Sequence, residues 1–178
     1  MNAAESASRA WLQDIVVGEG FCPFASAVPS QAIQFTVCSS KDTESALMAF
    51  AEACQFLEAT PSTETSLVIF DQGFRLFDRY LELLEYAEAL LVQMGYEGIF
   101  QIASFHPHYV FEGSDENDAA NFTNRSPYPM LHLLRESSLT QALSSVEDAD
   151  AIPENNIQHA RSLGNEYFIN ILNNYKSS

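Results

Sequence analysis

The chain has 178 residues, 47% of them hydrophobic, which is enough to bury one substantial core and excludes an intrinsically disordered protein. Its net charge of −16, from 24 acidic and 8 basic residues, argues against nucleic acid and membrane surfaces as partners, because both carry negative charge. Three cysteines without a CxxC pair fit a reducing compartment, and no apolar stretch is long enough to cross a bilayer, so we expect a cytoplasmic protein.

The first third of the chain predicts two helices and a strand. Residues 3–17 have the spacing of an amphipathic helix that ends at Gly18, and their charges argue against a signal peptide. Residues 21–25 follow as a turn or a short helical start. Residues 32–38 alternate between apolar and polar, which predicts a strand, and residues 43–59 repeat apolar side chains at helical spacing.

The middle of the chain predicts two further strands around a long helix. Residues 67–70 are a short continuous apolar run, typical of a strand covered on both faces. Residues 75–94 are rich in leucine and predict a helix closed by Gly95. Residues 99–105 predict a third buried strand.

The last third predicts helices after a polar loop. Ser126 is a good N-cap residue with Pro127 at the first helical position, which predicts a helix that includes Glu136. A second short helix follows from a capping box that begins at Ser138. A last helix begins near Pro153.

We therefore predict a single α/β domain over residues 1–178, with a small, mainly parallel sheet of three or four strands. Strands that alternate with helices imply a β-α-β-α-β core with right-handed crossovers, to which the N-terminal and C-terminal helices are added. We expect strand order 2-1-3, with the crossover helices on opposite faces. Order 1-2-3, with both helices on one face, is the alternative, and residues 109–111 could add a fourth strand.

The predicted functional site lies where the third strand ends. Ligands of open parallel sheets bind beyond the carboxyl ends of the strands. Those ends are residues 38–40, 71–73 and 104–106, and only the third opens into a long polar segment. Residues 106–136 contain three of the four histidines, so both the topology and the composition indicate a site at His106.

The histidines allow two kinds of chemistry. We predict that His106 is an acid/base group, with a hydrogen-bonded structural role as the alternative. His106 and His108 would point to the same side of an extended chain, as a metal-binding pair can. The metal alternative therefore combines them with Asp118, although Asp115 or His132 could also supply the third ligand.

Arg125 is the first candidate for holding an anion. It precedes the expected N-cap residue Ser126, and helix N-termini attract anions. Because two prolines remove N–H donors there, the predicted substrate-binding group consists of the side chains of Asn124, Arg125 and Ser126. The alternative is that Arg125 pairs with a carboxylate of the acidic loop.

His132 and Arg135 extend this candidate site. With Glu136 they have the i, i+3, i+4 spacing that places side chains on one helix face. We predict that His132 is a second catalytic acid/base group and that Arg135 binds the anion. An ordinary solvated helix face is the alternative.

Cys22 is the third catalytic candidate. A thiol at the start of the helix that follows it would have a lowered pKa and be nucleophilic. Cys54 lies on an apolar helical stripe and is expected to be an inert core residue, and Cys38 ends a strand.

Four segments of the chain are similar to hallmark segments of domain-of-unknown-function family 1415, an uncharacterised bacterial protein family. They are Phe21-Cys22-Pro23-Phe24-Ala25, Ala103-Ser104-Phe105-His106-Pro107, the stretch from Asn121 to Glu136 without Met130, and Ile152-Pro153-Glu154-Asn155-Asn156. The resemblance covers essentially the whole chain. It implies a small cytoplasmic protein and supplies no reaction.

Three functions are consistent with these residues. The first is an enzyme that acts on a small anionic metabolite through the His/Arg/Asn site. The second is a non-catalytic binding or assembly protein in which the polar segment pins the fold, and the third is a metal-dependent hydrolase. The sequence contains no GxSxG, P-loop or GxGxxG motif, and it leaves the identity of any cofactor unknown.

Overall fold

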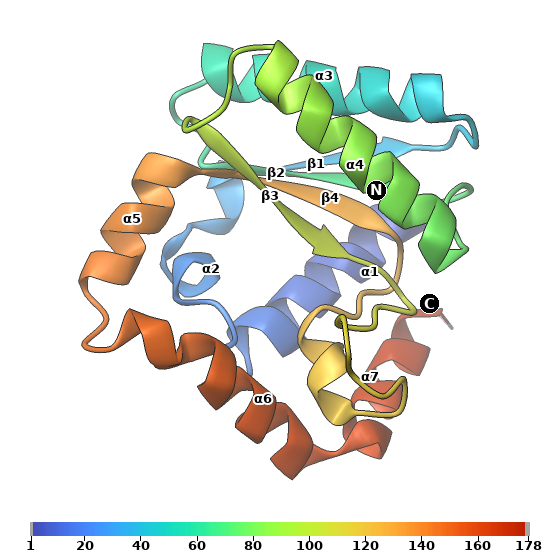
Figure 1. Ribbon diagram of the computed structural model, residues 1–178, viewed down its shortest axis with the longest axis vertical. Helices are drawn as coiled ribbons and strands as arrows, with labels where there is room; N and C mark the ends of the chain where they lie inside the picture. The colour runs from blue at the N-terminus through green and yellow to red at the C-terminus, as the bar shows by residue number, and fades with distance from the viewer. Residues whose placement is uncertain (1, 177–178) are drawn as a thin grey trace.

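A computed structural model of the protein describes residues 2–176 and contains a four-stranded sheet in the order β1-β2-β4-β3 (Figure 1). The strands are β1 (Ile33–Cys38), β2 (Thr65–Phe70), β3 (Phe100–Phe105) and β4 (Met130–Arg135). β1 and β2 are parallel, whereas β4 lies between β2 and β3 and is antiparallel to both. The sheet is therefore mixed, and β1, β2 and β3 run in the same direction.

Helices cover both faces of the sheet (Figure 1). One face packs against the two long helices, α3 (Thr43–Ala59) and α4 (Phe77–Gln93). The elements that contribute to the core on the other face are α1 (Ala3–Trp11), a π-helical turn (Leu12–Val17), α2 (Pro23–Ala27), the 3-10 helix η3 (Ala119–Thr123), α6 (Ile152–Leu163) and α7 (Asn165–Lys176). α5 (Glu136–Ser144) packs against α2, and short 3-10 helices occupy Ser30–Ala32 and Ala149–Ala151.

Alternate residues of the central strands separate the two cores. Val68 of β2 and Leu131 of β4 point toward α3 and α4, whereas Leu67 and Met130 point toward the other helices. All four side chains are fully buried. A strand covered on both faces is apolar at nearly every position, as both of these segments are.

The α/β class and the predicted β-α-β-α-β core are confirmed, but a mainly parallel sheet and the strand order 2-1-3 are wrong. The crossover helices α3 and α4 lie on one face, as the alternative order implied, because successive crossovers of one hand move across the sheet in one direction. Residues 130–135, expected to be helical, instead form β4 and pair with strands on both sides. Residues 109–111 form no strand.

The helix ends follow local chemistry. Asp42 caps α3, since its carboxylate accepts a hydrogen bond from the Ser45 N–H at 2.8 Å. Gly95 follows α4 with a positive φ of 81°, and Gly164, with φ of 78°, separates α6 from α7. α5 begins at Glu136, so the capping box expected at Ser138 is wrong. No described helix is long and apolar enough to cross a membrane.

Candidate functional site

The His106 ring is fully buried and both of its nitrogens are hydrogen-bonded. Nε2 lies 3.0 Å from the carbonyl oxygen of Phe74, and Nδ1 accepts the backbone N–H of His108 at 2.9 Å. The ring also packs against Phe77 and Tyr80 of α4. Burial lowers the pKa of His106 to about 4, so the imidazole is neutral and donates through Nε2–H. These contacts favour the structural role for His106.

His132 is also buried and hydrogen-bonded. Its Nε2 lies 2.6 Å from the hydroxyl oxygen of Thr65, and that hydroxyl donates to the Leu133 carbonyl, so the ring is the donor to Thr65. Burial lowers the pKa of His132 to about 4. The His132 ring therefore provides a hydrogen-bond donor for the buried Thr65 hydroxyl inside the sheet.

His106 and His132 lie on opposite faces of the sheet. His106 contacts α4, whereas His132 has the same side-chain direction as Met130 and packs against Phe105, on the face of α1. The expected convergence of the two rings on one cleft is therefore wrong. It depended on a helix at residues 130–136, where the chain forms a strand.

Arg125 holds the polar loop in place. Its guanidinium donates to the carbonyl oxygens of Tyr109 at 3.0 Å and Glu116 at 2.7 Å, and it stacks over the Phe122 ring. Asn124 donates to the Ser104 carbonyl at 3.0 Å. These bonds tie residues 104–125 to one another.

Ser126 and Arg135 have similar internal partners. The Ser126 hydroxyl donates to the Tyr128 carbonyl at 2.6 Å and caps no helix. Arg135 donates to the carbonyl oxygens of Leu57, Thr60 and Thr63, and so satisfies the C-terminal end of α3. Because their donors are used inside the protein, these side chains are poorly suited to bind an anion.

Cys22 is the N-cap residue of α2, as expected, but its thiol is not activated. Burial raises the pKa of Cys22 and outweighs the lowering by the N–H groups of Ala25 and Phe24. The predicted low pKa is therefore wrong. Cys54 is fully buried, and burial raises its pKa to about 12.

The metal alternative finds no support in the described part of the chain. Within residues 2–176, no group of three or more His, Cys, Asp or Glu side chains is arranged to hold a metal ion. Asp118 instead accepts two hydrogen bonds from Arg161, at 3.1 and 2.7 Å, and caps η3. These contacts hold its pKa at about 2.

A different set of charged residues meets at the carboxyl edge of the sheet. Lys41 follows β1, Arg75 follows β2, and Arg79 lies in the first turn of α4. These three of the chain's eight basic residues line one pocket of about 210 Å³. Neither Lys41 nor Arg75 forms an ion pair with a described acidic side chain, whereas Arg79 pairs with Glu82.

The helix next to this pocket begins without a side-chain cap. The N-cap residue of α4 is Leu76, whose side chain cannot accept a hydrogen bond. The N–H groups of the first turn are therefore available to solvent or to an anion, and the helix dipole favours negative charge there.

An adjoining pocket of about 330 Å³ shares Arg75 and contains Asp71 and His108. Asp71 follows β2 directly, and its Oδ1 atom is buried without a hydrogen-bond partner among the described residues. His108 is exposed. A buried carboxylate oxygen without a partner is costly, so this atom is a candidate for contact with a ligand.

The loop between these pockets is strained and tightly packed. Phe74 has a φ of 58°, which is unusual for a residue other than glycine, and its carbonyl is held by His106. Gly73 passes so close to the first loop that an added side-chain carbon would lie 2.8 Å from the Ser40 carbonyl oxygen. The surrounding structure therefore fixes the position of Arg75 relative to Lys41.

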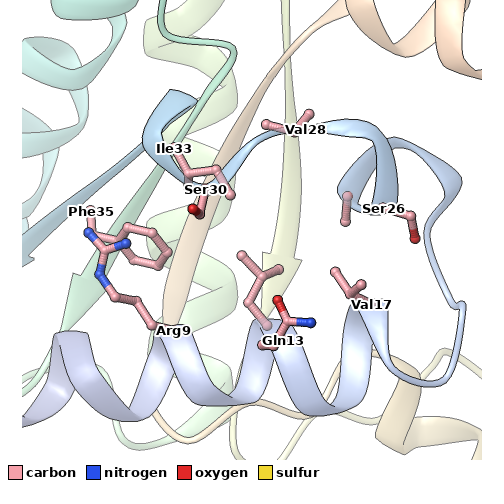
Figure 2. Close-up of a pocket in the computed structure, with 10 residues that line it drawn as sticks. Arg9, Gln13, Val17, Ser26, Val28, Ser30, Ile33 and Phe35 are labelled. Carbon is pink, nitrogen blue, oxygen red and sulfur yellow. The ribbon is translucent and has the colours of Figure 1, made fainter.

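A further pocket, of about 300 Å³, is lined by residues of α1, the π-helical turn, α2 with the segment after it, and β1. Figure 2 shows the side chains that line it. The charged side chain that it contains is Arg9, which pairs with Glu5 at 2.8 Å and lies over the ring of Phe35. With this guanidinium engaged, the pocket offers less to an anion than the carboxyl edge does.

Comparison with known proteins identifies the family. The model of the family described as protein of unknown function (DUF1415) matches residues 3–170. The chain belongs to this family. Neither the curated proteins nor the solved structures contain a match.

The family match extends over every strand and over both pockets at the carboxyl edge. The sequence predicts a site at that edge, including residues 71–73, but indicates no role for Lys41, Asp71, Arg75 or Arg79. The position of Lys41 and Asp71 just after predicted strands was the signal that could have found them. The roles of Arg75 and Arg79 depend on how the loop between β2 and α4 packs, which the sequence alone does not show.

Proposed function

We propose that the protein binds a small anionic metabolite at the carboxyl edge of the sheet, through Lys41, Arg75, Arg79 and the N-terminus of α4. The observation that carries this proposal is the grouping of three cationic side chains around one pocket in a chain of net charge −16. The anion-binding candidates predicted from the sequence, Arg125 and Arg135, are less suitable because their donors are bonded to backbone carbonyls.

The local charges favour an anion over other ligands. The general field of an acidic protein repels anions, so binding requires a local concentration of positive charge. Arg75 forms no ion pair with a described acidic side chain, and its planar donors suit the oxygens of a phosphate or a carboxylate, whereas Arg79 adds positive charge while it pairs with Glu82. The uncapped first turn of α4 adds backbone donors of the same kind.

Asp71 and His108 support a second, catalytic proposal for the same edge. Because Arg75 lines both pockets, an anion held by Arg75 would extend toward Asp71 and His108. The partnerless Asp71 oxygen favours a substrate that carries a hydroxyl or ammonium donor beside its anionic group. In this proposal His108, which is exposed, accepts the proton that this hydroxyl or ammonium group releases.

Thermal unfolding with millimolar anions tests the binding proposal. Inorganic phosphate, sulfate and malate are compared with chloride at equal ionic strength, which separates site binding from general salt effects. A ligand at roughly 100 times its Kd stabilises a protein by about 2.7 kcal/mol. We expect at least one oxyanion to raise Tm in the wild type and to lose that effect in Arg75→Gln.

Arg9→Gln is the matched control, because it removes the same charge from a guanidinium that is already paired with Glu5. It should retain the anion-dependent rise in Tm. Equal stabilisation of wild type and Arg75→Gln would place the anion elsewhere, and no stabilisation by any oxyanion would refute the proposal.

A further inference from the structure

A larger cavity, of about 590 Å³, lies between α6, β3 and η3, on the face of the sheet that packs against α1. It is lined by residues of the segment before α2, of β3, of the polar loop and of α6, among them Cys22, Ala103, Asn124 and Asn156. None of its lining residues belongs to the anion pockets. Its volume is within the roughly 300–1,000 Å³ typical of sites for small organic molecules.

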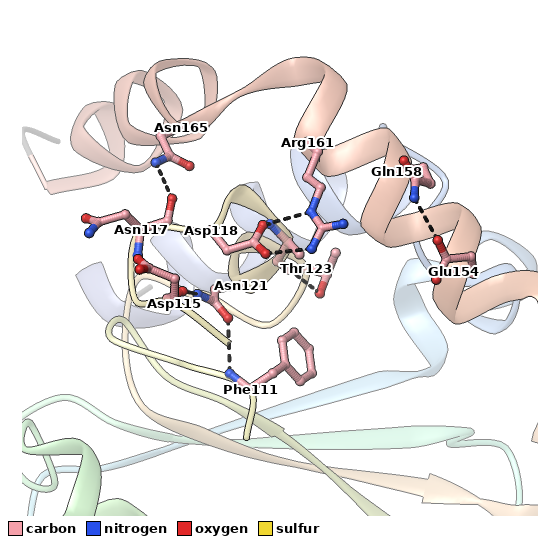
Figure 3. Close-up of polar contacts among 11 residues, drawn as sticks. Phe111, Asp115, Asn117, Asp118, Asn121, Thr123, Glu154, Gln158, Arg161 and Asn165 are labelled. Atoms are coloured by element: carbon pink, nitrogen blue, oxygen red, sulfur yellow. Dashed lines mark hydrogen bonds and ion pairs between the residues drawn. The ribbon is translucent and has the colours of Figure 1, made fainter. Parts of the chain in front are cut away.

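The walls of the cavity are held by fixed polar contacts. Figure 3 shows Arg161 of α6 joined to Asp118 at the start of η3, and Asn165 bonded to the carbonyl of Asn117. The fully buried Asn121 accepts the Phe111 N–H at 3.0 Å. Because these contacts already fix the loop against the helices, a ligand would pay little free energy to organise the cavity.

The lining is mainly apolar, with a few polar groups that converge on the space. Phe21, Phe105, Phe111 and Ile157 are among the apolar residues that line it. Asn156 donates from Nδ2 to the Phe21 carbonyl at 2.7 Å, which fixes its amide and leaves Oδ1 as an acceptor. This arrangement fits an apolar molecule that donates a hydrogen bond.

The charges at the cavity do not favour an anion, and its mainly apolar lining makes the desolvation of an ion of either sign costly. Arg161 is neutralised by its bidentate contact with Asp118, and Glu112 is exposed and negative. An anion would meet the uncompensated Glu112 and the acidic field of the chain. A neutral molecule avoids both costs.

A protein partner fits this cavity less well than a small molecule. Protein interfaces bury broad surfaces with large exposed apolar side chains, whereas this space is concave. The exposed large apolar residues of the described chain are Met48, Phe56, Leu76, Leu81, Tyr86, Val92, Ile99 and Ile169. None of them lines the cavity.

We propose that this cavity binds a small, mainly apolar and uncharged molecule that carries a hydrogen-bond donor and lies against the thiol of Cys22. The site is independent of the anion site, so either can fail without the other.

Protection of Cys22 from iodoacetamide tests this proposal on the intact chain. 2-Naphthol is the probe, because it is flat, apolar, neutral and carries one hydroxyl donor. Naphthalene-2-sulfonate is its charged counterpart. We expect 2-naphthol to slow alkylation of Cys22 several-fold and to leave Cys38 unchanged, as measured by peptide mass spectrometry, while the sulfonate protects neither thiol.

A pair of neighbouring substitutions on α6 supplies the control. Ile157→Trp fills the cavity and should abolish protection, whereas Gln158→Trp, at an exposed position, should keep it. If Ile157→Trp does not fold, amide chemical shifts of the wild type decide the question. 2-Naphthol should then shift the amides of residues 103, 120–124 and 156–157.

Three results would overturn the proposal. Equal protection by the sulfonate would refute the neutral ligand class. Unchanged alkylation of Cys22 together with unshifted amides would refute the site. Protection that increases with protein concentration in the absence of probe would show that a second copy of the chain covers the cavity.

Discussion

The ring of His106 donates a hydrogen bond of 3.0 Å to the carbonyl oxygen of Phe74, the described residue other than glycine that has a positive φ. The same ring accepts the backbone N–H of His108 at 2.9 Å. One buried imidazole therefore connects the strained loop that carries Arg75 with the loop that carries His108. Its role is to position the two pockets at the carboxyl edge.

Neutral buried histidines make stability depend on pH. Burial lowers the folded-state pKa of both His106 and His132 from 6.5 to about 4. The unfolded chain therefore binds more protons than the folded chain between these values, so the free energy of unfolding falls as pH decreases from about 6.5 to 4. Each ring contributes roughly 3 kcal/mol of this loss. Urea unfolding at pH 7.0, 5.5 and 4.5 measures it.

His106→Gln provides the control for the pH series. Its amide can still donate to the Phe74 carbonyl but cannot titrate, so the variant should lose about half of the pH dependence. The Asp42 and Asp118 carboxylates, each with a pKa of about 2, titrate below this window. A wild type that is equally stable at pH 7.0 and 4.5 would contradict the assignment of neutral rings.

Gly73→Ala should weaken anion binding without touching the ligand. The new methyl group would lie 2.8 Å from the Ser40 carbonyl oxygen and 3.1 Å from the Lys41 Cα, so one loop must move. We expect a loss of roughly 1–3 kcal/mol in the free energy of unfolding and a several-fold weaker phosphate titration. Ser39→Ala, at an exposed position of the facing loop that does not line the pocket, should leave both values near wild type. If Gly73→Ala binds phosphate with unchanged affinity, the position of this loop does not determine anion binding.

Arg125→Ala should lower stability and leave anion binding intact. The substitution removes the charge-assisted hydrogen bonds to the Tyr109 and Glu116 carbonyls, which should cost roughly 2 kcal/mol. Arg125→Lys should recover only part of that loss, because lysine lacks the planar fork. Urea unfolding and limited proteolysis within residues 109–116 measure the effect. An Arg125→Ala variant that keeps wild-type stability but binds oxyanions more weakly would show that the anion binds at Arg125.

Thiol labelling should distinguish the three cysteines. Cys22 and Cys38 are partly exposed, whereas Cys54 is fully buried in the core between α3 and the sheet. Alkylation of native protein at pH 8 should therefore modify Cys22 and Cys38 first. The raised pKa of Cys22 predicts a rate below that of an unhindered thiol such as free cysteine. Faster modification of Cys54, or a Cys22 that reacts faster than free cysteine, would contradict this environment.

The elements with a clear period were predictable from the sequence. α3 and α4 repeat their apolar residues at helical spacing, and β1 and β2 follow ordinary strand patterns. β4 was not predictable in this way, since Met130-Leu131-His132-Leu133-Leu134 is apolar toward both faces and fits a buried helix equally well. Ser126 and Pro127 also match the sequence pattern of a helix start, but the Ser126 hydroxyl donates to the Tyr128 carbonyl and caps no helix.

The candidate site was predictable as an edge but not as a set of residues. β1, β2 and β3 run in the same direction, so their carboxyl ends lie at one edge of the sheet, where the sequence predicted a site. The antiparallel strand β4 between β2 and β3 leaves that edge in place. The roles of the arginines depended on partners far away in the sequence. Arg135 bonds to the Thr63 carbonyl, 72 positions earlier, and Arg125 bonds to Tyr109 across a folded loop. Only tertiary structure reveals which guanidinium groups remain available.

The proposed anion site lies between Lys41, Arg75 and the first turn of α4. Titration of 15N-labelled protein with inorganic phosphate, followed by amide chemical shifts, locates the bound anion and so tests this proposal. We predict that the largest saturable changes occur at residues 41 and 73–79, and that Arg75→Gln removes them. Saturable changes confined to residues 109–125, or no saturable change at all, would contradict the proposal.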